Sequence, residues 1–165
     1  MLKKFASSLL VVMLLMGCGT KPSASNVVPG GTETAVSNDS AEQEAEKLVD
    51  ELKLTDEMTL AKERVMLGMV FGGDADAVKS GALYLSSETG NSNTVGVFQT
   101  DDVKKCEDYI NAYLETQKAS TETYYPEEVF KISNAIIQDN GKDCVVLVIC
   151  EDIENAKKMV SDYLS

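Results

Sequence analysis

Pairs of carboxylates are the side chains of this sequence whose types and spacing could support catalysis or metal binding. Two carboxylates held close together can act as general acid and base on a glycan or coordinate calcium. Three of the four pairs lie at expected helix starts, where negative charge is stabilising, and the fourth flanks a turn without the spacing of a calcium loop. We therefore interpret them as helix caps, turns and solvated positions. The pairs are Asp74/Asp76, Asp101/Asp102, Glu127/Glu128 and Asp139/Asp143.

Cys18 is a residue whose surroundings indicate a specific covalent modification. Two lysines precede an apolar stretch over residues 5–16, which is shorter than the roughly 20 residues that span a bilayer and is typical of an export signal. The stretch ends in Leu15-Met16-Gly17-Cys18, which resembles the lipobox of bacterial lipoproteins. In that motif the cysteine thiol receives a diacylglyceryl group and becomes the new N-terminus.

This resemblance implies three segments and a location. Residues 1–17 would be a lipoprotein signal peptide, 18–40 a lipidated cysteine with a flexible linker, and 41–165 a single domain. Two acyl chains on one residue give lasting membrane attachment, so we expect the domain at the outer face of the cytoplasmic membrane. The membrane lipid that carries the Cys18 anchor is then its first partner.

Charge restricts the other partners. Removal of Lys3 and Lys4 with the signal peptide lowers the 15 basic side chains to 13, against 27 acidic ones, which leaves a net charge of −14. Such a surface repels phosphate backbones, so we expect no nucleic-acid partner.

Histidine is absent from the chain, which excludes activation of serine or cysteine by histidine and metal binding by histidine. We expect no catalytic residue, no metal site and no cofactor. The chain is accordingly predicted to be a non-catalytic binding or accessory module for an unknown protein or small molecule. The alternative is a carboxylate-dependent hydrolase that acts on cell-wall material.

Three further cysteines lie in apolar segments, at positions 106, 144 and 150. In a strand, Cys144 and Cys150 would lie about 20 Å apart, far beyond the Cα separation that a disulfide spans. A bridge could therefore join only Cys106 to one of them. We favour buried free thiols, which behave as small apolar groups.

Apolar periodicity predicts the elements that position these residues. A helix begins at Ser40, and residues 62–71 form a short buried helix that ends at Gly72-Gly73, with a strand as the alternative. Strands over 82–85 and 94–98 form a hairpin. Asp101 or Asp102 caps the helix that follows, and Asp152 caps the last helix. Residues 144–150 are apolar on both faces, which is typical of a central strand. The fold class is α+β, an antiparallel sheet of about four strands with helices packed on it.

Two finer expectations concern the last strands. Asn140-Gly141 is typical of a two-residue hairpin turn, which would place Ile137 opposite Cys144 and Ala135 opposite Val146. A shift of fifty residues superimposes Val95 on Val145 and Asp102 on Asp152, so the strand–strand–helix order indicates a duplication. Chance similarity of two Asp-capped amphipathic helices is the alternative.

One loop is the strongest candidate for partner contact, because aromatic side chains in a loop are typical of recognition surfaces. Burial of the tyrosines against the core is the competing interpretation. The loop consists of Tyr124, Tyr125, Pro126, Glu127 and Glu128.

Residues from about 56 to 164 resemble a family of lipoproteins from Gram-positive bacteria that share a domain of unknown function (domain of unknown function 4358). The resemblance implies one exported domain of this length and carries over no catalytic residue. Two positions depart from the family pattern: Thr94-Val95-Gly96 replaces an acidic pair and isoleucine, and Cys144 replaces a tyrosine. The matching segments are Asp56-Glu57-Met58, Phe71-Gly72, Val97-Phe98, Tyr125-Pro126-Glu127-Glu128-Val129, Asn134-Ala135-Ile136-Ile137 and Val145 to Ile149.

Overall fold

The structure is a computed structural model that describes residues 39–165. The predicted signal peptide (1–17), the lipidated Cys18 and all but the last two residues of the predicted linker (18–40) lie outside the described residues. Among the described helices, none is both long and apolar enough to cross a membrane.

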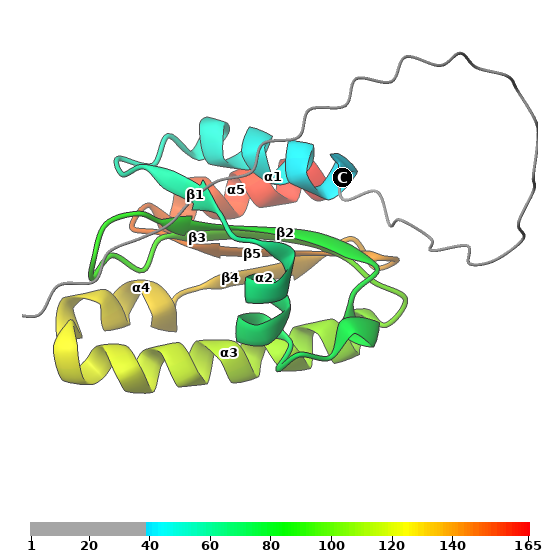
Figure 1. Cartoon of the computed structure of the whole chain (residues 1–165). Coiled ribbons are helices and arrows are strands. Elements are labelled where there is room, and N and C mark those ends of the chain that lie inside the picture. The colour runs from blue at the N-terminus through cyan, green and yellow to red at the C-terminus, as the bar shows by residue number, and fades with distance from the viewer. Residues whose placement is uncertain (1–38) are drawn as a thin grey trace, which may run out of the picture. The chain divides into compact units, whose positions relative to one another are not determined.

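An open antiparallel sheet of five strands forms the centre of the fold, in the order β1-β2-β3-β5-β4 (Figure 1). The predicted α+β class is confirmed, with one strand more than expected. The extra strand, β1, contains three residues at the sheet edge, too few for alternation to be recognised in the sequence. The strands are β1 (Met58–Leu60), β2 (Ser80–Ser86), β3 (Thr94–Gln99), β4 (Ile136–Asp139) and β5 (Cys144–Ile149).

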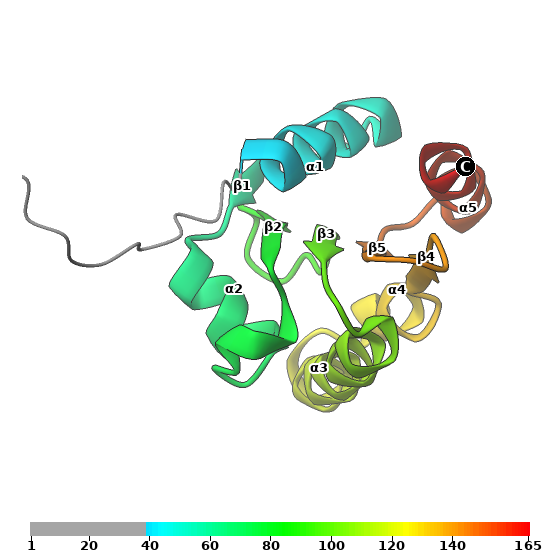
Figure 2. The ribbon, with the colours of Figure 1, turned by 90° about the vertical axis from the view of Figure 1, so that its right-hand side faces the viewer.

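Helices cover both faces of the sheet (Figure 2). One layer holds α2, α3 and α4, and the opposite layer holds α1 and α5. The Tyr163 hydroxyl donates to Glu44 Oε2 at 2.6 Å and thereby joins α5 to α1. The helices are α1 (Asp39–Leu52), α2 (Glu63–Val70), α3 (Val103–Tyr124), α4 (Val129–Ser133) and α5 (Ile153–Leu164), with short 3₁₀ helices η1 (Ala75–Ala77) and η2 (Pro126–Glu128).

The central position predicted for the last strand is confirmed. Every residue of β5 is buried, and the strand pairs with β3 on one side and β4 on the other. Its side chains alternate between two apolar cores, which the sheet separates. Val145, Leu147 and Ile149 face the α3 layer, whereas Cys144, Val146 and Val148 face the α1 and α5 layer.

The same separation explains the cysteines. Cys106 belongs to the α3 core, whereas Cys144 and Cys150 belong to the opposite core. All three thiols are free and buried, as the favoured interpretation predicted, and neither alternative bridge from Cys106 is formed.

The helix predicted over residues 62–71 is formed by residues 63–70, but only one side of it is buried. Met66 and Val70 enter the core, whereas Val65 and Met69 are exposed at the surface. The continuous apolar run concealed this amphipathic arrangement, because it contains no polar residue to mark the outer side of the helix.

The register predicted for the last hairpin is wrong. Ile137 lies opposite Leu147, not Cys144, and Asp139 lies opposite Val145. Asn140 causes the difference, because its Oδ1 accepts hydrogen bonds from the backbone N–H groups of Lys142, Asp143 and Cys144 at 3.0, 3.0 and 3.1 Å. These bonds stabilise a longer turn, and the odd-numbered shift moves Ile137 to the α3 face.

The strand–strand–helix order occurs twice, as β2-β3-α3 and β4-β5-α5. The two helices, however, cover opposite faces of the sheet. A twofold rotation perpendicular to the sheet would superimpose the two hairpins but leave both helices on one face. The repeated order in the sequence therefore does not extend to a superimposable pair of halves.

Candidate functional site

Two of the acidic pairs supply helix caps, as the sequence predicts. Asp74 Oδ1 accepts the backbone N–H of Asp76 at 3.0 Å at the start of η1, and Asp102 Oδ1 accepts that of Lys105 at 3.0 Å at the start of α3. Asp74 also accepts the Tyr109 hydroxyl at 2.8 Å and the Lys105 ammonium at 2.9 Å. These hydrogen bonds, that from Lys105 first, hold the pKa of Asp74 below its ordinary value.

The pair that flanks the last hairpin supplies turn contacts. Asp139 Oδ1 accepts the N–H of Gly141 at 2.6 Å, and Asp143 accepts the Asn140 amide at 3.1 Å. No group of three or more acidic, histidine or cysteine side chains within residues 39–165 is arranged to hold a metal ion.

A carboxyl pair that the sequence did not indicate joins α3 to β4. Burial, together with the charge and hydrogen bond of Asp139, raises the pKa of Glu107 above its ordinary value. The two residues belong to different elements and to no recognisable motif, so only the fold brings them together.

The predicted contact loop divides into an outward part and an inward part. Tyr124 is 76% exposed, and the neighbouring Phe130 of α4 is 61% exposed. Tyr125 packs over Gly90, where a Cβ atom would lie 2.5 Å from the tyrosine ring. Burial of the two tyrosines is the competing interpretation of this loop. Tyr125 agrees with it in part, because its ring packs over Gly90, whereas Tyr124 is exposed and does not.

Glu128 turns inward and is the centre of a polar network. Its Oε2 lies 2.6 Å from Lys131 Nζ and accepts the backbone N–H and the hydroxyl of Ser92 at 2.8 and 2.7 Å. Burial alone would raise the pKa of Glu128, but the hydrogen bonds from Lys131 and Ser92 outweigh it and hold the pKa below its ordinary value. The sequence predicts Glu128 at the contact surface, whereas in the structure its carboxylate is largely buried and bonded within the protein.

The network continues through two asparagines to a buried aspartate. Lys131 donates to Asn91 Oδ1 at 3.1 Å and to Asn93 Oδ1 at 3.3 Å. The Asn93 amide in turn donates to Asp56 Oδ1 at 2.6 Å. All three ammonium protons of Lys131 are thereby directed at acceptors, so this lysine fixes the β2–β3 connection rather than offering a free charge.

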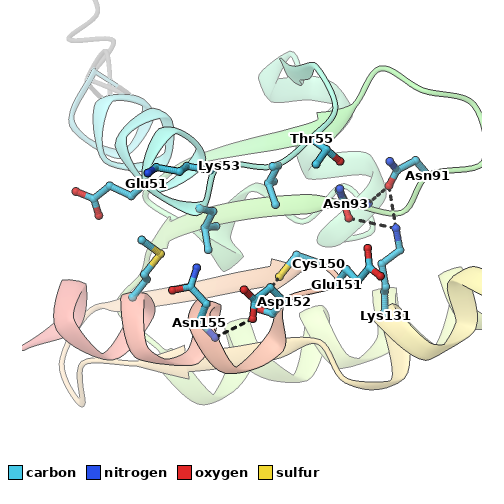
Figure 3. Close-up of a pocket in the computed structure, with 13 residues that line it drawn as sticks. Glu51, Lys53, Thr55, Asn91, Asn93, Lys131, Cys150, Glu151, Asp152 and Asn155 are labelled. Carbon is cyan, nitrogen blue, oxygen red and sulfur yellow. Dashed lines mark hydrogen bonds between the residues drawn. The ribbon is translucent and has the colours of Figure 1, made fainter.

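Beside this network lies a pocket of about 590 Å³ (Figure 3). Four separate segments form its walls: the end of α1 with the residues that follow it, the β2–β3 connection, α4, and the start of α5 with the end of β5. Leu52, Leu54 and Met159 supply apolar surface, and the remaining lining is polar. The polar and thiol-bearing residues that line it are Glu51, Lys53, Thr55, Asn91, Asn93, Lys131, Cys150, Glu151, Asp152 and Asn155.

Lys53 has an unusual backbone at the rim of this pocket. Its φ of 50° makes it the one positive-φ residue other than glycine within the described part of the chain. It directly follows α1, at the position where glycine or asparagine commonly ends a helix. The sequence shows a lysine at an expected helix end, but the pocket that it borders could not be recognised without the fold.

Cys150 lines the pocket, but its thiol is a poor nucleophile. Burial raises its pKa, and its Sγ lies 3.6 Å from the carbonyl oxygen of Asp152, to which it donates. Burial also raises the pKa of Cys106 to about 12 and that of Cys144 to about 11. Reactive cysteines need the opposite shift. The arrangement suits the binding of a small polar molecule better than covalent catalysis.

Comparison with known proteins gives one match. The profile of a domain of unknown function (DUF4358) matches residues 50–150. No curated protein and no solved structure matches the chain.

Proposed function

This chain belongs to the family that shares a domain of unknown function (DUF4358), and we propose that it is a non-catalytic binding protein anchored by lipid at the outer face of the cytoplasmic membrane. The pocket between α1, α5, α4 and the β2–β3 connection is its ligand site.

The proposal rests on the way in which the polar wall of the pocket is held in place. Its polar wall is held by the ion pair of Glu128 and Lys131, whose side chains are only 14% and 13% exposed. Positioned polar groups in a concave, partly apolar site are typical of small-molecule binding. The volume of about 590 Å³ also falls in the usual range for such sites, roughly 300–1,000 Å³.

Membrane anchorage is supported by the lipobox-like Leu15-Met16-Gly17-Cys18. Replacement of Cys18 by alanine should release the protein into the medium or leave the signal peptide uncleaved. Intact-mass spectrometry of the wild-type protein should show a diacylglyceryl group on Cys18. A free thiol at that residue would refute the anchor without affecting the proposal for the pocket.

The ligand site can be tested before its ligand has been identified. Fractionated small-molecule extracts from the source cells should raise the melting temperature of the wild-type protein. Asn155→Trp, on the exposed pocket side of α5, should fill the pocket and abolish the shift. Glu154→Trp, the adjacent exposed residue outside the pocket lining, is the matched control and should respond as the wild type does. An equal response of the two variants would contradict the proposal.

A second candidate is contact with a protein partner through the aromatic end of α3 and α4. Tyr124 and Phe130 are strongly exposed, and the exposed Glu122 and Glu127 beside them favour a partner that combines basic and apolar side chains. Crosslinking and pull-down from intact cells should recover such a partner with the wild type but not with a Tyr124→Ala, Phe130→Ala variant.

The hydrolase alternative has weaker support. Retaining and inverting glycosidases place two carboxylates about 5–5.5 and 6.5–9.5 Å apart on either side of the bond that they cleave, whereas neither Glu107 nor Asp139 lines the pocket. Turnover of wall fragments that disappears in Glu107→Gln and Asp139→Asn would favour that alternative.

A further inference from the structure

The pocket carries charges of opposite sign that the rest of the described chain leaves unpaired. Lys53 forms no ion pair with any residue in the range 39–165, and neither does Glu151. Lys53 lies on the α1 wall, whereas Glu151 and Asp152 lie at the base of α5 (Figure 3). The α1 wall also carries Glu51, which pairs with Lys47 at 3.7 Å, so a ligand that spans the pocket meets the unpaired cation of Lys53 on that wall and carboxylates at the base of α5.

The backbone of Lys53 is strained at the rim of the pocket. A left-handed φ of 50° is unfavourable for lysine and favourable for glycine. Strained backbone of this kind is concentrated at ligand sites, where the side chain or the local shape is needed. The position ends α1, where glycine would adopt this backbone more easily, and the exposed lysine gains no burial in the core in return.

The other lining groups add hydrogen bonding and apolar contact. The Thr55 hydroxyl and the Asn155 side-chain amide make no side-chain hydrogen bond to any described residue, although the backbone N–H of Asn155 donates to Asp152. Both can therefore reach peptide groups of a ligand. Leu52, Leu54 and Met159 border the same space and would accommodate apolar side chains.

We propose that the pocket binds the zwitterionic main chain of a short peptide or free amino acid with apolar side chains, its carboxylate at Lys53 and its ammonium at Glu151 and Asp152. This inference rests on the proposed ligand site. A volume of about 590 Å³ exceeds what one amino acid fills, so a peptide of two or three residues should bind more tightly than the free amino acid.

Isothermal titration with defined probes tests the charges of the ligand. Leucyl-leucine should bind the wild-type protein, and leucine should bind more weakly. N-acetyl-leucyl-leucine and leucyl-leucinamide each lack one charge and should bind at least tenfold more weakly. Equal binding of either blocked peptide, or no binding of leucyl-leucine and leucine at millimolar concentration, would overturn the proposal.

Variants of Lys53 separate recognition from folding. Lys53→Gly keeps the left-handed turn and removes the ammonium, so the melting temperature should rise while affinity for leucyl-leucine falls at least tenfold. Lys53→Gln should lose the same affinity without the gain in stability, and Lys158→Gln, an exposed lysine outside the pocket lining, is the charge-matched control. Unchanged affinity in Lys53→Gly would refute the role of Lys53.

The failure of this inference can be told from failure of the proposed ligand site. If leucyl peptides do not bind but cell extracts still stabilise the wild type and not Asn155→Trp, the pocket is a ligand site of different chemistry. If neither probe nor extract gives a response that depends on the pocket, both proposals are refuted.

Discussion

Glu128 and Lys131 form an ion pair of 2.6 Å in which both side chains are largely buried. The spacing is the same as that of Glu154 and Lys157, which lie 3.4 Å apart on α5 with side chains 89% and 56% exposed. Residues 39–165 thus contain two i,i+3 pairs that differ in burial. The exposed pair is an internal reference against which the contribution of the buried pair can be measured.

Removal of one member of the buried pair should be costly. Lys131→Met leaves the Glu128 carboxylate without its cation and should lower the free energy of unfolding by about 3 kcal/mol. Lys157→Met should change it by less than about 1 kcal/mol, because exposed ion pairs contribute little. Urea denaturation of both variants measures the difference. Adding Glu128→Gln to Lys131→Met should recover part of the loss, and a further additive loss would contradict the account.

The raised pKa of Glu107 should make stability fall as pH rises. The folded-state pKa of Glu107 lies above its ordinary value of 4.5, so the folded protein binds this proton more tightly than the unfolded chain does. Stability from this group is complete below pH 4.5 and is lost as pH rises through the folded-state pKa. The groups that face Glu107 are Asp139 on β4 and Asp108 and Lys104 on α3.

Glu107→Gln should remove this pH dependence and raise stability at pH 7 by roughly 0.5 kcal/mol, a value reduced by partial solvent screening. The free energy of unfolding from pH 4 to 8 is the measurement. Glu122→Gln, on an exposed part of the same helix, serves as the control. Glu128 should change stability in the opposite direction. Its pKa is lowered in the folded protein, so its contribution to stability is lost as pH falls, whereas that of Glu107 is lost as pH rises.

Gly90 should be more sensitive to substitution than Gly73, although both have similar positive φ values, 84° and 87°. A Cβ atom at Gly73 meets nothing within 4 Å, whereas at Gly90 it would lie 2.5 Å from the Tyr125 ring. Gly73→Ala should therefore cost only the backbone strain, about 1 kcal/mol, and Gly90→Ala should cost more. The Gly90→Ala, Tyr125→Ala variant should be less destabilised than the sum of the two single losses, because the ring that meets the new Cβ atom is gone; thermal melting of all three variants measures this.

The three cysteines of the domain should resist alkylation in the folded protein. Burial raises the pKa of Cys106 to about 12 and that of Cys144 to about 11, so thiolate is scarce at pH 8. In a Cys18→Ala protein, a chromogenic disulfide reagent should modify no thiol rapidly before urea is added and three afterwards. Rapid modification of one thiol in the native protein would identify an accessible cysteine and contradict the buried positions.

The elements of the fold can be predicted wherever the sequence shows a period or a cap. Local pattern alone identifies the central strand of residues 144–149, the caps at Asp102 and Asp152 and the helix at residues 63–70. It does not identify the hairpin register, which depends on three backbone N–H groups that converge on Asn140 Oδ1. The Asn-Gly dipeptide predicts a turn, but it does not predict the hydrogen bonds that the Asn140 side chain accepts.

The candidate site is less accessible to sequence reasoning, since its residues come from distant segments. Lys131 lies three positions beyond the predicted contact loop, yet its acceptors Asn91 and Asn93 come from a connection that the sequence marks only as a turn. Asp56 is joined to them across 37 residues. A network of this kind becomes visible only after the sheet has brought the β2–β3 connection against α4.

The lengths of the edge strands have a consequence for self-association. The sheet ends in strands of three and four residues, β1 and β4, whereas the wholly buried Cys144–Ile149 segment is enclosed between β3 and β4. Short edges offer little backbone for pairing with a second molecule, while six consecutive apolar, β-branched-rich residues are an aggregation hazard once released. Edge-to-edge pairing of folded domains should therefore be weak, whereas heating beyond the unfolding transition should end in precipitation rather than in refolding.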